Sequence, residues 1–472
     1  VRYRLWMDFD RVFLLDLHGN KRRKELTPQG NRDDNVFDKI MQGVSINLFI
    51  KKTSLAEFGR CYFSEKYGVR SLKNSFLQNN YFGKYLFQIN SYDNKPFLQE
   101  LPTNIELFNY LFMCSMDVDL DICQRYYKGF SLCDGFQNYR IGMQTGANAR
   151  LRDMFKEKLE EKLIRENNGQ NIDLTTIKPY LVRPFETYYV YYVKDKNTSL
   201  SLHPNIGYPA SYRSRYETLS HLLHENIALL VPRQIVTSIY RHVFCTTEIV
   251  DACAISNTST EQNQVFPLYL YINGERTLNI KSYIVDEFIK LANIDDIGTM
   301  IFDYIYAVLH SVEYRTKFFE FLTFEQPRIP YPKNKEIFLT LAKLGRELLD
   351  THLLKSKVFF NISTNLRNKD GHIIHESLTL TQVRPKAPTS QSAKEIQTWN
   401  QQIWINETQY FDGVSENIWE TYIGGYQPAK KWIEERKDCI LHQEEVLHYS
   451  KIIKALEETD RIMKEIDQID FL

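Results

Sequence analysis

No complete catalytic motif is present in the sequence. It has no Gly-x-Ser-x-Gly turn of a serine hydrolase, no Walker phosphate-binding loop and no His-Glu-x-x-His zinc helix. Gly424-Gly425 lacks the following glycine pattern and the later acidic residue that a dinucleotide-binding loop requires. These absences exclude the enzyme classes that depend on such motifs, and we expect no catalytic residue in this chain.

Cysteine is sparse and offers neither a disulfide framework nor a metal site. The seven Cys are scattered without a Cys-x-x-Cys pair, which suits reduced, mostly buried thiols in the cytoplasm. Histidines come in three close pairs, His221 with His224, His372 with His375, and His442 with His448. Only the last pair has a Cys nearby, the single Cys439, so we interpret these histidines as surface or core residues rather than zinc ligands.

Long apolar runs and a net charge are missing as well. There is no run of about 18 apolar residues and no signal peptide, so we expect no membrane-spanning segment and a cytoplasmic location. Lys plus Arg and Asp plus Glu number 59 each, so the total charge indicates no particular partner. A DNA-binding chain with this balance must gather its basic residues on one face.

Aromatic residues are abundant, and one acidic cluster is present. The 30 Tyr and 29 Phe favour large mixed cores, and a surface that stacks on nucleobases or sugars is the alternative. Asp117, Asp119 and Asp121 alternate with apolar residues. Such acids can hold a divalent metal, but an exposed strand or turn face is the favoured interpretation.

The N-terminal pattern predicts two adjacent strands joined by a long basic loop. Residues 12–15 form an apolar run that ends in the polar turn of residues 16–20, and residues 44–50 form a second run. The densest basic run of the chain, Lys21-Arg22-Arg23-Lys24, lies between them.

Further along, strand and helix patterns alternate. Strand patterns occupy residues 187–193 and 265–272. Helical spacing occurs at residues 104–114, 147–165, 335–354 and from residue 299, where Ser311 can cap a following helix. Prolines make residues 327–332 extended, and residues 385–394 are a predicted linker. The chain ends in an amphipathic helix whose apolar residues are Val446, Tyr449, Ile453, Leu456, Met463 and Ile466.

Short stretches spread over almost the whole chain carry a family resemblance. They are residues 15–20, 35–38, 42–46, 142–146, 183–186, 231–234, 306–311, 313–315, 327–330 and 423–428, the last ahead of Lys431-Trp432. In number and order they resemble the methyltransferase and target-recognition region of type ISP and related single-chain restriction–modification enzymes.

The resemblance implies a mixed α+β chain with three parts. These are the terminal strands of a Rossmann-like methyltransferase sheet in residues 1–125, a mixed α/β target-recognition domain in residues 126–384, and its helical C-terminal part in residues 395–472. The implied function is recognition of double-stranded DNA for an S-adenosylmethionine-dependent N6-adenine methyltransferase.

The catalytic parts of that family do not occur in the sequence. Pro-Pro is absent, and so is the glycine-rich turn for S-adenosylmethionine. We expect both upstream of Val1, where some family members also carry helicase-like and nuclease parts. The chain alone is therefore expected to bind no cofactor and to transfer no methyl group.

The resemblance also implies DNA contacts near the N-terminus. Phe37 lies in the segment whose aromatic residue packs against the flipped adenine, because a flipped base needs a flat apolar face. Core packing at the start of a strand is the alternative for Phe37. Lys21, Arg22, Arg23 and Lys24 are predicted to bind phosphates, or else to form a solvated loop without a partner.

Four further residues stand out in the middle of the chain. Thr145, in a turn flanked by glycines, is predicted to approach the DNA backbone closely. Arg183 and Arg233, each beside a proline, are predicted to anchor the core by a buried ion pair rather than to contact bases. Arg328, between extended prolines, is predicted to be structural.

A second function stays open at this point. The chain can instead be a protein-interaction or scaffold module, in which the C-terminal amphipathic helix docks on another subunit and the apolar face exposed by the missing strands is an interface.

Overall fold

The computed structural model describes residues 11–21, 25–37, 40, 42–51, 60–79, 120–145, 151–166, 173–194, 212–323, 325–362, 364–374, 378–379, 384–385 and 401–472. The chain forms two compact units, unit 1 (Val1–Lys128) and unit 2 (Gly129–Leu472). Among the described helices, none combines the length and the apolar character needed to span a bilayer.

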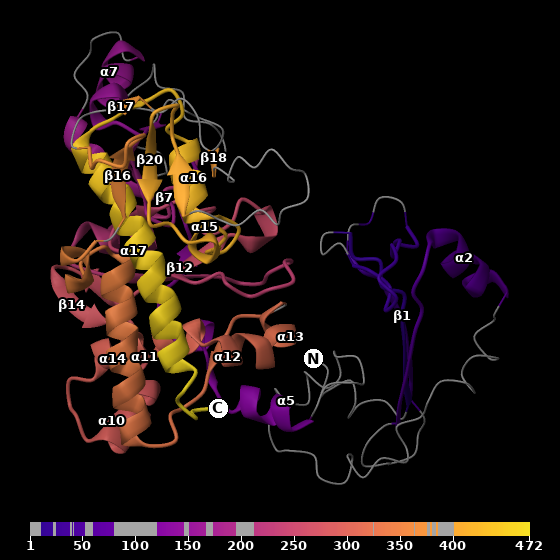
Figure 1. Ribbon diagram of the computed structural model, residues 1–472. Helices are drawn as coiled ribbons and strands as arrows, with labels where there is room; N and C mark the ends of the chain where they lie inside the picture. Colours follow the sequence, from indigo (N-terminus) through magenta and orange to yellow (C-terminus); the bar gives the residue numbers. More distant parts are fainter. Residues whose placement is uncertain are drawn as a thin grey trace. The chain divides into compact units, whose positions relative to one another are not determined.

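Unit 1 contains a small mixed sheet with the order β2-β1-β3 (Figure 1). Its strands are β1 (Arg11–Asp16), β2 (Ser45–Ile50) and β3 (Arg60–Glu65), with helices α2 (Arg70–Asn79) and α5 (Leu120–Tyr127) further along the chain. Strand β1 pairs antiparallel with β2 and parallel with β3. The predicted pair of adjacent strands joined by a long loop is therefore confirmed, while their place in a Rossmann-like sheet stays a prediction.

Two four-stranded sheets form the strand-rich part of unit 2. The first has the order β10-β9-β12-β5 and consists of Phe244–Thr246, Ala228–Pro232, Asn263–Pro267 and Arg140–Ile141. The second has the order β11-β7-β8-β6 and consists of Ile249–Val250, Ile177–Arg183, Glu186–Tyr191 and Arg152–Asp153. All five residues of β9 are buried, as its continuous apolar sequence predicts.

The segment after β5 joins the two sheets. The Gly142 N–H donates to the Asn263 carbonyl beside the first sheet (3.1 Å), and the Met143 N–H donates to the Val250 carbonyl of the second (2.8 Å). Gly142 is required at this crossing because a Cβ there would lie 2.6 Å from the carbonyl oxygen of Asp251.

A helical layer covers the remaining part of unit 2. It consists of α10 (Ser282–Ala292), α11 (Gly298–His310), α12 (Val312–Lys317), α13 (Phe319–Leu322), α14 (Lys335–His352) and α17 (Gln443–Ile466). Helices α11, α14 and α17 lie side by side (Figure 1). The helices predicted from residue 299, over residues 335–354 and at the C-terminus are confirmed. Ser311 caps α12 as predicted, accepting from the Tyr314 N–H (3.0 Å).

Smaller elements complete unit 2. A third four-stranded sheet has the order β16-β20-β19-β18 and consists of Asn365–Asn368, Gln409–Asp412, Gln402–Trp404 and Arg384–Pro385. The two-stranded pairs are β13 (Tyr269–Ile272) with β14 (Glu275–Leu278), β15 (Arg328–Ile329) with β4 (Phe130–Ser131), and β17 (Leu378–Thr379) with β21 (Ile440–Leu441). The other helices are α6 (Leu132–Gly135), α7 (Lys156–Glu166), α9 (Tyr216–Leu219), α15 (Glu416–Trp419), α16 (Pro428–Glu434) and the 3-10 turns Leu174–Thr176, Ser220–Leu223, Ser259–Glu261 and Lys357–Phe360.

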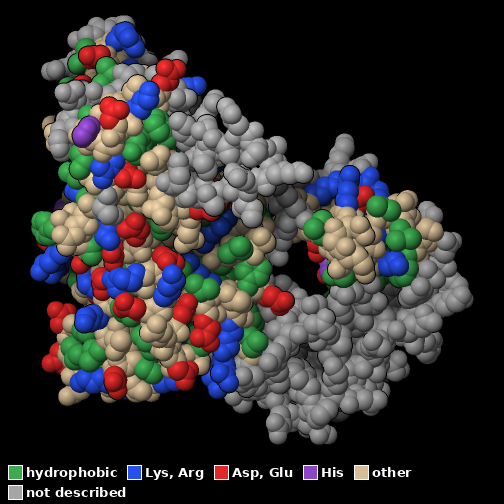
Figure 2. All heavy atoms as spheres, in the orientation of Figure 1, with side chains coloured by type: hydrophobic (Ala, Val, Ile, Leu, Met, Phe, Trp, Pro, Cys, Tyr) green, Lys and Arg blue, Asp and Glu red, His purple; other side chains and the backbone are tan. Residues whose placement is uncertain are grey.

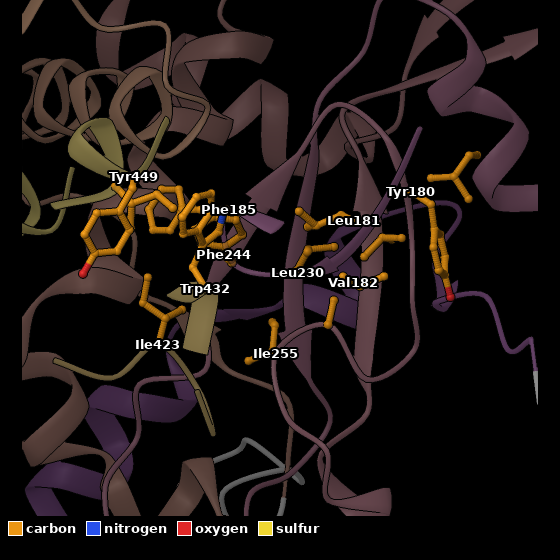
Figure 3. Packing of buried hydrophobic residues seen from close by; sticks show 14 of the residues in the cluster. Tyr180, Leu181, Val182, Phe185, Leu230, Phe244, Ile255, Ile423, Trp432 and Tyr449 are labelled. Atoms are coloured by element: carbon orange, nitrogen blue, oxygen red, sulfur yellow. The ribbon is translucent and has the colours of Figure 1, made fainter. Parts of the chain in front are cut away.

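One hydrophobic core links the sheets to the C-terminal helices. Figure 3 shows Phe185, Phe244, Trp432 and Tyr449 grouped at one end of it, with Leu181 further along. The apolar face of α17 contributes Tyr449, Ile452, Ile453, Ala455 and Leu456 to this core. That face is covered by the chain's own unit, so the C-terminal helix does not offer the free docking surface that the scaffold hypothesis requires.

The predicted helix over residues 147–165 is wrong for residues 151–155. Arg152–Asp153 is a strand that pairs with β8, and α7 begins only at Lys156. The Asp153 carboxylate accepts from the Phe155 N–H (3.0 Å), a local bond that competes with helix formation. Residues 104–114, residues 386–394 of the predicted linker and the side chains of Asp117, Asp119 and Asp121 lie outside what the structure describes, while Pro385 ends strand β18.

A chain of hydrogen bonds ties the three long helices together. The Thr459 hydroxyl donates to the Ala455 carbonyl (2.6 Å), so it accepts from Nε2–H of His352 (2.9 Å). Nδ1 of His352 is then the acceptor for the Tyr306 hydroxyl (2.6 Å), which fixes a neutral tautomer. Burial first, and the charge of Arg315 second, lower the pKa of His352 to about 3.

The neutral His352 predicts a loss of stability in acid. The unfolded chain takes up the proton below about pH 6.5, so the contribution of His352 is complete above that pH and is lost as the pH falls toward 3. We expect the folding free energy to drop by about 2 kcal/mol between about pH 7 and pH 5 through this residue. His352→Gln should be less stable at neutral pH and less sensitive to acid, measured by urea unfolding. Equal pH slopes for the two proteins would contradict the assignment.

Candidate nucleic-acid interface

Phe37 lies on a loop of unit 1 that hydrogen bonds of the buried Asn35 hold in place. The Phe37 side chain is 54% exposed, so core packing does not account for it. Its N–H donates to Oδ1 of the buried Asn35 (2.8 Å), whose Nδ2 donates to the carbonyls of Gln42 (2.5 Å) and Gly19 (3.2 Å). The loop is therefore fixed while the ring stays accessible.

A buried ion pair supports the same loop. Lys73 of α2 has a fully buried side chain, and its ammonium donates to the Asp33 carboxylate (2.9 Å) and to the carbonyls of Leu17 (2.7 Å) and Asp34 (2.8 Å). Asp33 also accepts from the Gly68 N–H (2.6 Å). Because every bond of this charge is satisfied, the loop that leads to Phe37 is anchored to α2.

The basic loop is described only at its borders. Lys21 is half-buried, and Arg22, Arg23 and Lys24 lie outside the described residues. Glu25 closes the loop by accepting from the Asn20 N–H (2.7 Å) and bonding the His18 ring (2.8 Å). Burial raises the pKa of Glu25, but these hydrogen bonds outweigh it and lower the pKa overall. Several basic side chains gather at one end of the described part of this unit (Figure 2).

Unit 2 contains an open cavity of about 540 Å³ whose walls come from distant parts of the sequence. Three of the stretches that carry the family resemblance meet there, those around residues 142–146, 183–186 and 423–428. The lining residues are Gln144, Thr145, Arg152, Val182, Arg183, Tyr188, Asp251, Ala252, Cys253, Gln262, Tyr426 and Glu435.

Asp251 organises one wall of the cavity. Its carboxylate accepts from Arg152 (3.3 Å), from the hydroxyl of the buried Tyr180 and from the Cys253 N–H (2.7 Å). Burial first and the Asp251 carboxylate second raise the pKa of Tyr180, so this hydroxyl stays a donor. Arg152 remains partly exposed, with 38% of its side chain accessible.

Arg183 is the cation around which a second group of lining residues is arranged. Its guanidinium pairs with Glu435 (3.2 Å), donates to the Tyr188 hydroxyl (3.3 Å) and lies 6.0 Å from the ring centre of Tyr426. Arg183 therefore forms an ion pair as predicted, but the pair is only partly buried, with 16% of the Arg183 side chain and 31% of the Glu435 side chain exposed. Burial raises the pKa of Glu435, but the Lys431 hydrogen bond and the charge of Arg183 lower it overall, which keeps the carboxylate ionised.

A glycine turn places Tyr426 in the cavity wall. Gly424 has φ +58°, and a Cβ there would lie 2.1 Å from the Ile255 carbonyl oxygen. The Gly424 N–H donates to the Arg241 carbonyl (2.8 Å) and the Gly425 N–H to the Ile255 carbonyl (2.9 Å). The Tyr426 hydroxyl then reaches the Cys253 carbonyl (3.0 Å).

Thr145 and Gln144 form the rim on the side of the second sheet. Thr145 is only 3% exposed and lines the cavity, so its predicted approach to a DNA backbone stays a prediction. The backbone of Gln144 pairs with that of Arg213 (2.8 and 3.0 Å), and its side chain accepts from Arg215 (3.4 Å). One further cation, the guanidinium of Arg215, therefore stands beside the lining residue Gln144.

The family of the chain follows from a match to these same regions. A family model described as Type ISP C-terminal specificity domain matches residues 136–465, more than two thirds of the chain. The chain belongs to this family of specificity domains. No curated protein matches the sequence.

Solved structures share the fold of this specificity-domain chain. One is the ATP-dependent Type ISP restriction-modification enzyme LlaBIII bound to DNA, with a TM-score of 0.57, 17% identity and coverage of 99% of this chain and 31% of that chain. The DrdV–DNA complex matches with a TM-score of 0.57 and 19% identity, over 98% of this chain and 48% of that chain. A nuclease-deletion mutant of the Type ISP enzyme LlaGI in complex with a DNA substrate mimic matches with a TM-score of 0.55 and 17% identity. The match covers 98% of this chain and 37% of that chain. The chain thus spans between 31% and 48% of the length of these proteins.

The arginines singled out by sequence differ in their burial. Arg328 is buried and donates to the Gly129 carbonyl (3.2 Å), so its structural role is confirmed. Arg233 is exposed, so a buried ion pair was the wrong prediction for it. Arg152 and Asp251 were missed, because neither stands in a motif and only the pairing of distant strands brings them together.

The Gly424 turn gives a test of how the cavity wall is built. Gly424→Ala places a Cβ against the Ile255 carbonyl in left-handed backbone, and we expect a loss of about 3 kcal/mol or more in folding free energy. Gly274→Ala is the matched control, since Gly274 also has positive φ (+86°) but nothing within 4 Å of its Cβ position. The control should lose about 1 kcal/mol in chemical denaturation. Similar losses for both variants would show that the close approach does not constrain the turn.

Proposed function

We propose that this chain recognises the DNA target for an S-adenosylmethionine-dependent N6-adenine methyltransferase of a restriction–modification system. The observation that carries the proposal is the specificity-domain match over residues 136–465. The similar solved structures of LlaBIII and DrdV are complexes with DNA, which supports DNA as the partner, and we propose the double-stranded form. Neither the cofactor turn nor a Pro-Pro turn occurs in these 472 residues, so the proposal assigns methyl transfer to residues outside them.

In this proposal unit 1 is the terminal part of the methyltransferase sheet. Phe37 would replace the stacking that a flipped adenine loses, and its exposure on an anchored loop supports that role. Lys21, Arg22, Arg23 and Lys24 would bind phosphates nearby without reading sequence. The helicase-like and nuclease parts of some relatives would act on the same DNA.

The scaffold hypothesis is less well supported. Its key feature was the C-terminal amphipathic helix, and the apolar face of α17 packs inside unit 2. No observation on the described residues favours a protein partner for this helix over the core that it already covers.

The basic loop is tested by the salt dependence of binding to duplex DNA. Removing one cation that binds a phosphate reduces the slope of log K against log salt by about 0.9, so Lys21→Ala, Arg22→Ala and Arg23→Ala together should reduce it by up to about 3. The control replaces the exposed Lys335, Lys343 and Lys369 of unit 2, which matches the change in charge. Absence of binding at low salt would overturn the proposed function, and equal effects of both triple variants would remove the loop from it.

Phe37 is tested by separating stability from binding. Because its ring is exposed, Phe37→Ala should change the folding free energy by less than about 1 kcal/mol, whereas Leu17→Ala in the core should cost about 2–5 kcal/mol. Loss of the flat ring should weaken binding to a duplex with one unpaired adenine about fivefold or more. Fluorescence anisotropy measures this, and Phe37→Trp should keep the affinity. If Phe37→Ala binds as tightly as the unchanged chain, the ring is not a stacking platform.

A further inference from the structure

The cavity of unit 2 has the size and shape of a small-molecule site rather than of a groove-reading surface. About 540 Å³ lies within the range of about 300–1,000 Å³ that such sites occupy. Base edges in duplex DNA are recessed in the major groove and are read by protruding helices or ribbons. Residues that line a hollow do not reach those edges, so the cavity suits a group that leaves the duplex stack and enters it.

The interior offers both hydrogen-bond polarities and aromatic rings. Gln262 and Gln144 carry donors and acceptors together, Asp251 supplies carboxylate oxygens, and the rings of Tyr188 and Tyr426 provide flat faces. Burial raises the pKa of Tyr426 to about 12, so its hydroxyl is neutral at ordinary pH. A neutral, flat group with donors and acceptors on its edge matches these walls.

Charge argues against a phosphate in the interior. Each inner arginine is paired with an acid, Arg183 with Glu435 (3.2 Å) and Arg152 with Asp251 (3.3 Å). Both carboxylates line the cavity and would repel an anion. The rim differs, because the Gln144 side chain accepts there from the guanidinium of Arg215 (3.4 Å).

We propose that this cavity binds a single unpaired nucleobase of DNA, with its sugar–phosphate held at the rim by Arg215. The base stacks on the ring of Tyr426 or Tyr188 and bonds the amides of Gln144 and Gln262, which is how proteins hold extruded bases. The assignment rests on the proposed binding of DNA and adds a site separate in sequence from Phe37.

Cys253 gives a direct readout, because it lines the cavity and its thiol accepts from the amide of Gln262, another lining residue (4.0 Å). The rate of its alkylation by N-ethylmaleimide is followed by peptide mass mapping in the full chain, and Cys133, also half-buried but outside the lining, is the internal reference. The probes are a single-stranded oligonucleotide and an abasic oligonucleotide of equal length, which keeps the phosphates and lacks the bases. We expect the base-bearing strand to slow Cys253 alkylation and to bind the chain about fivefold tighter or more than the abasic strand.

Variants separate stacking from folding. Tyr426→Phe keeps the ring and loses the hydrogen bond to the Cys253 carbonyl, so it should retain the preference for bases, whereas Tyr426→Ala should lose it. Phe37→Ala should leave the protection of Cys253 unchanged, because the two sites are distinct.

Three results would overturn the assignment. They are equal affinity for the two strands, equal protection of Cys253 by both, and protection that disappears in Phe37→Ala. Each leaves the proposed function standing as long as duplex DNA still binds with a steep salt dependence, so the two failures are distinguishable.

Discussion

Asp251 lies where the two large sheets of unit 2 and the cavity come together. Its N–H donates to the Leu181 carbonyl of β7 (2.9 Å), and its carbonyl accepts from the side chain of Asn263 in β12 (3.2 Å). The same carbonyl leaves no room for a side chain at Gly142. Its carboxylate meanwhile holds Arg152 in the cavity wall. Asp251 therefore bonds both sheets through its backbone and a cavity-lining arginine through its carboxylate, so the junction of the sheets also positions this wall of the cavity.

The sequence predicted what local pattern controls. Apolar residues at helical spacing predicted α11, α14 and α17, although α11 is buried on almost all sides, and the Ser311 cap was visible because a serine directly preceded an apolar-periodic segment. The start predicted for α7 was wrong for two reasons. The Asp153 carboxylate bonds the Phe155 N–H, and pairing with β8 overrides the helical spacing at residues 152–153. The ammonium of Lys73 gave no signal at all, since a buried lysine differs from an exposed one only in its distant partners.

The candidate site was predicted in its parts but not in its geometry. The stretches around Thr145, Arg183 and Tyr426 were recognised by family resemblance, yet nothing in their spacing says that they share one cavity. Strand pairing across the chain, such as β11 with β7, brings them together, and single-sequence patterns do not encode such pairs. Residue Asp251 sits in a segment of ordinary composition, so only its contacts reveal it. For Phe37 the alternatives were stacking on a flipped base and core packing; its side chain is 54% exposed, and the stacking role stays a prediction.

The balance of 59 basic and 59 acidic residues is compatible with a DNA interface for a structural reason. In the helical layer, cations are matched by nearby acids, as in Arg346 with Asp303 (2.5 Å) and Lys454 with Glu458 (2.9 Å). A phosphate backbone responds to charge within about 8–10 Å, so local arrangement outweighs the total. Arg215 donates to the Gln144 side chain beside a cavity whose inner arginines are paired with acids. In the binding mode proposed above, Arg215 would hold the phosphate while the paired interior takes the base, which is the separation that a nucleotide, charged at one end and neutral at the other, requires.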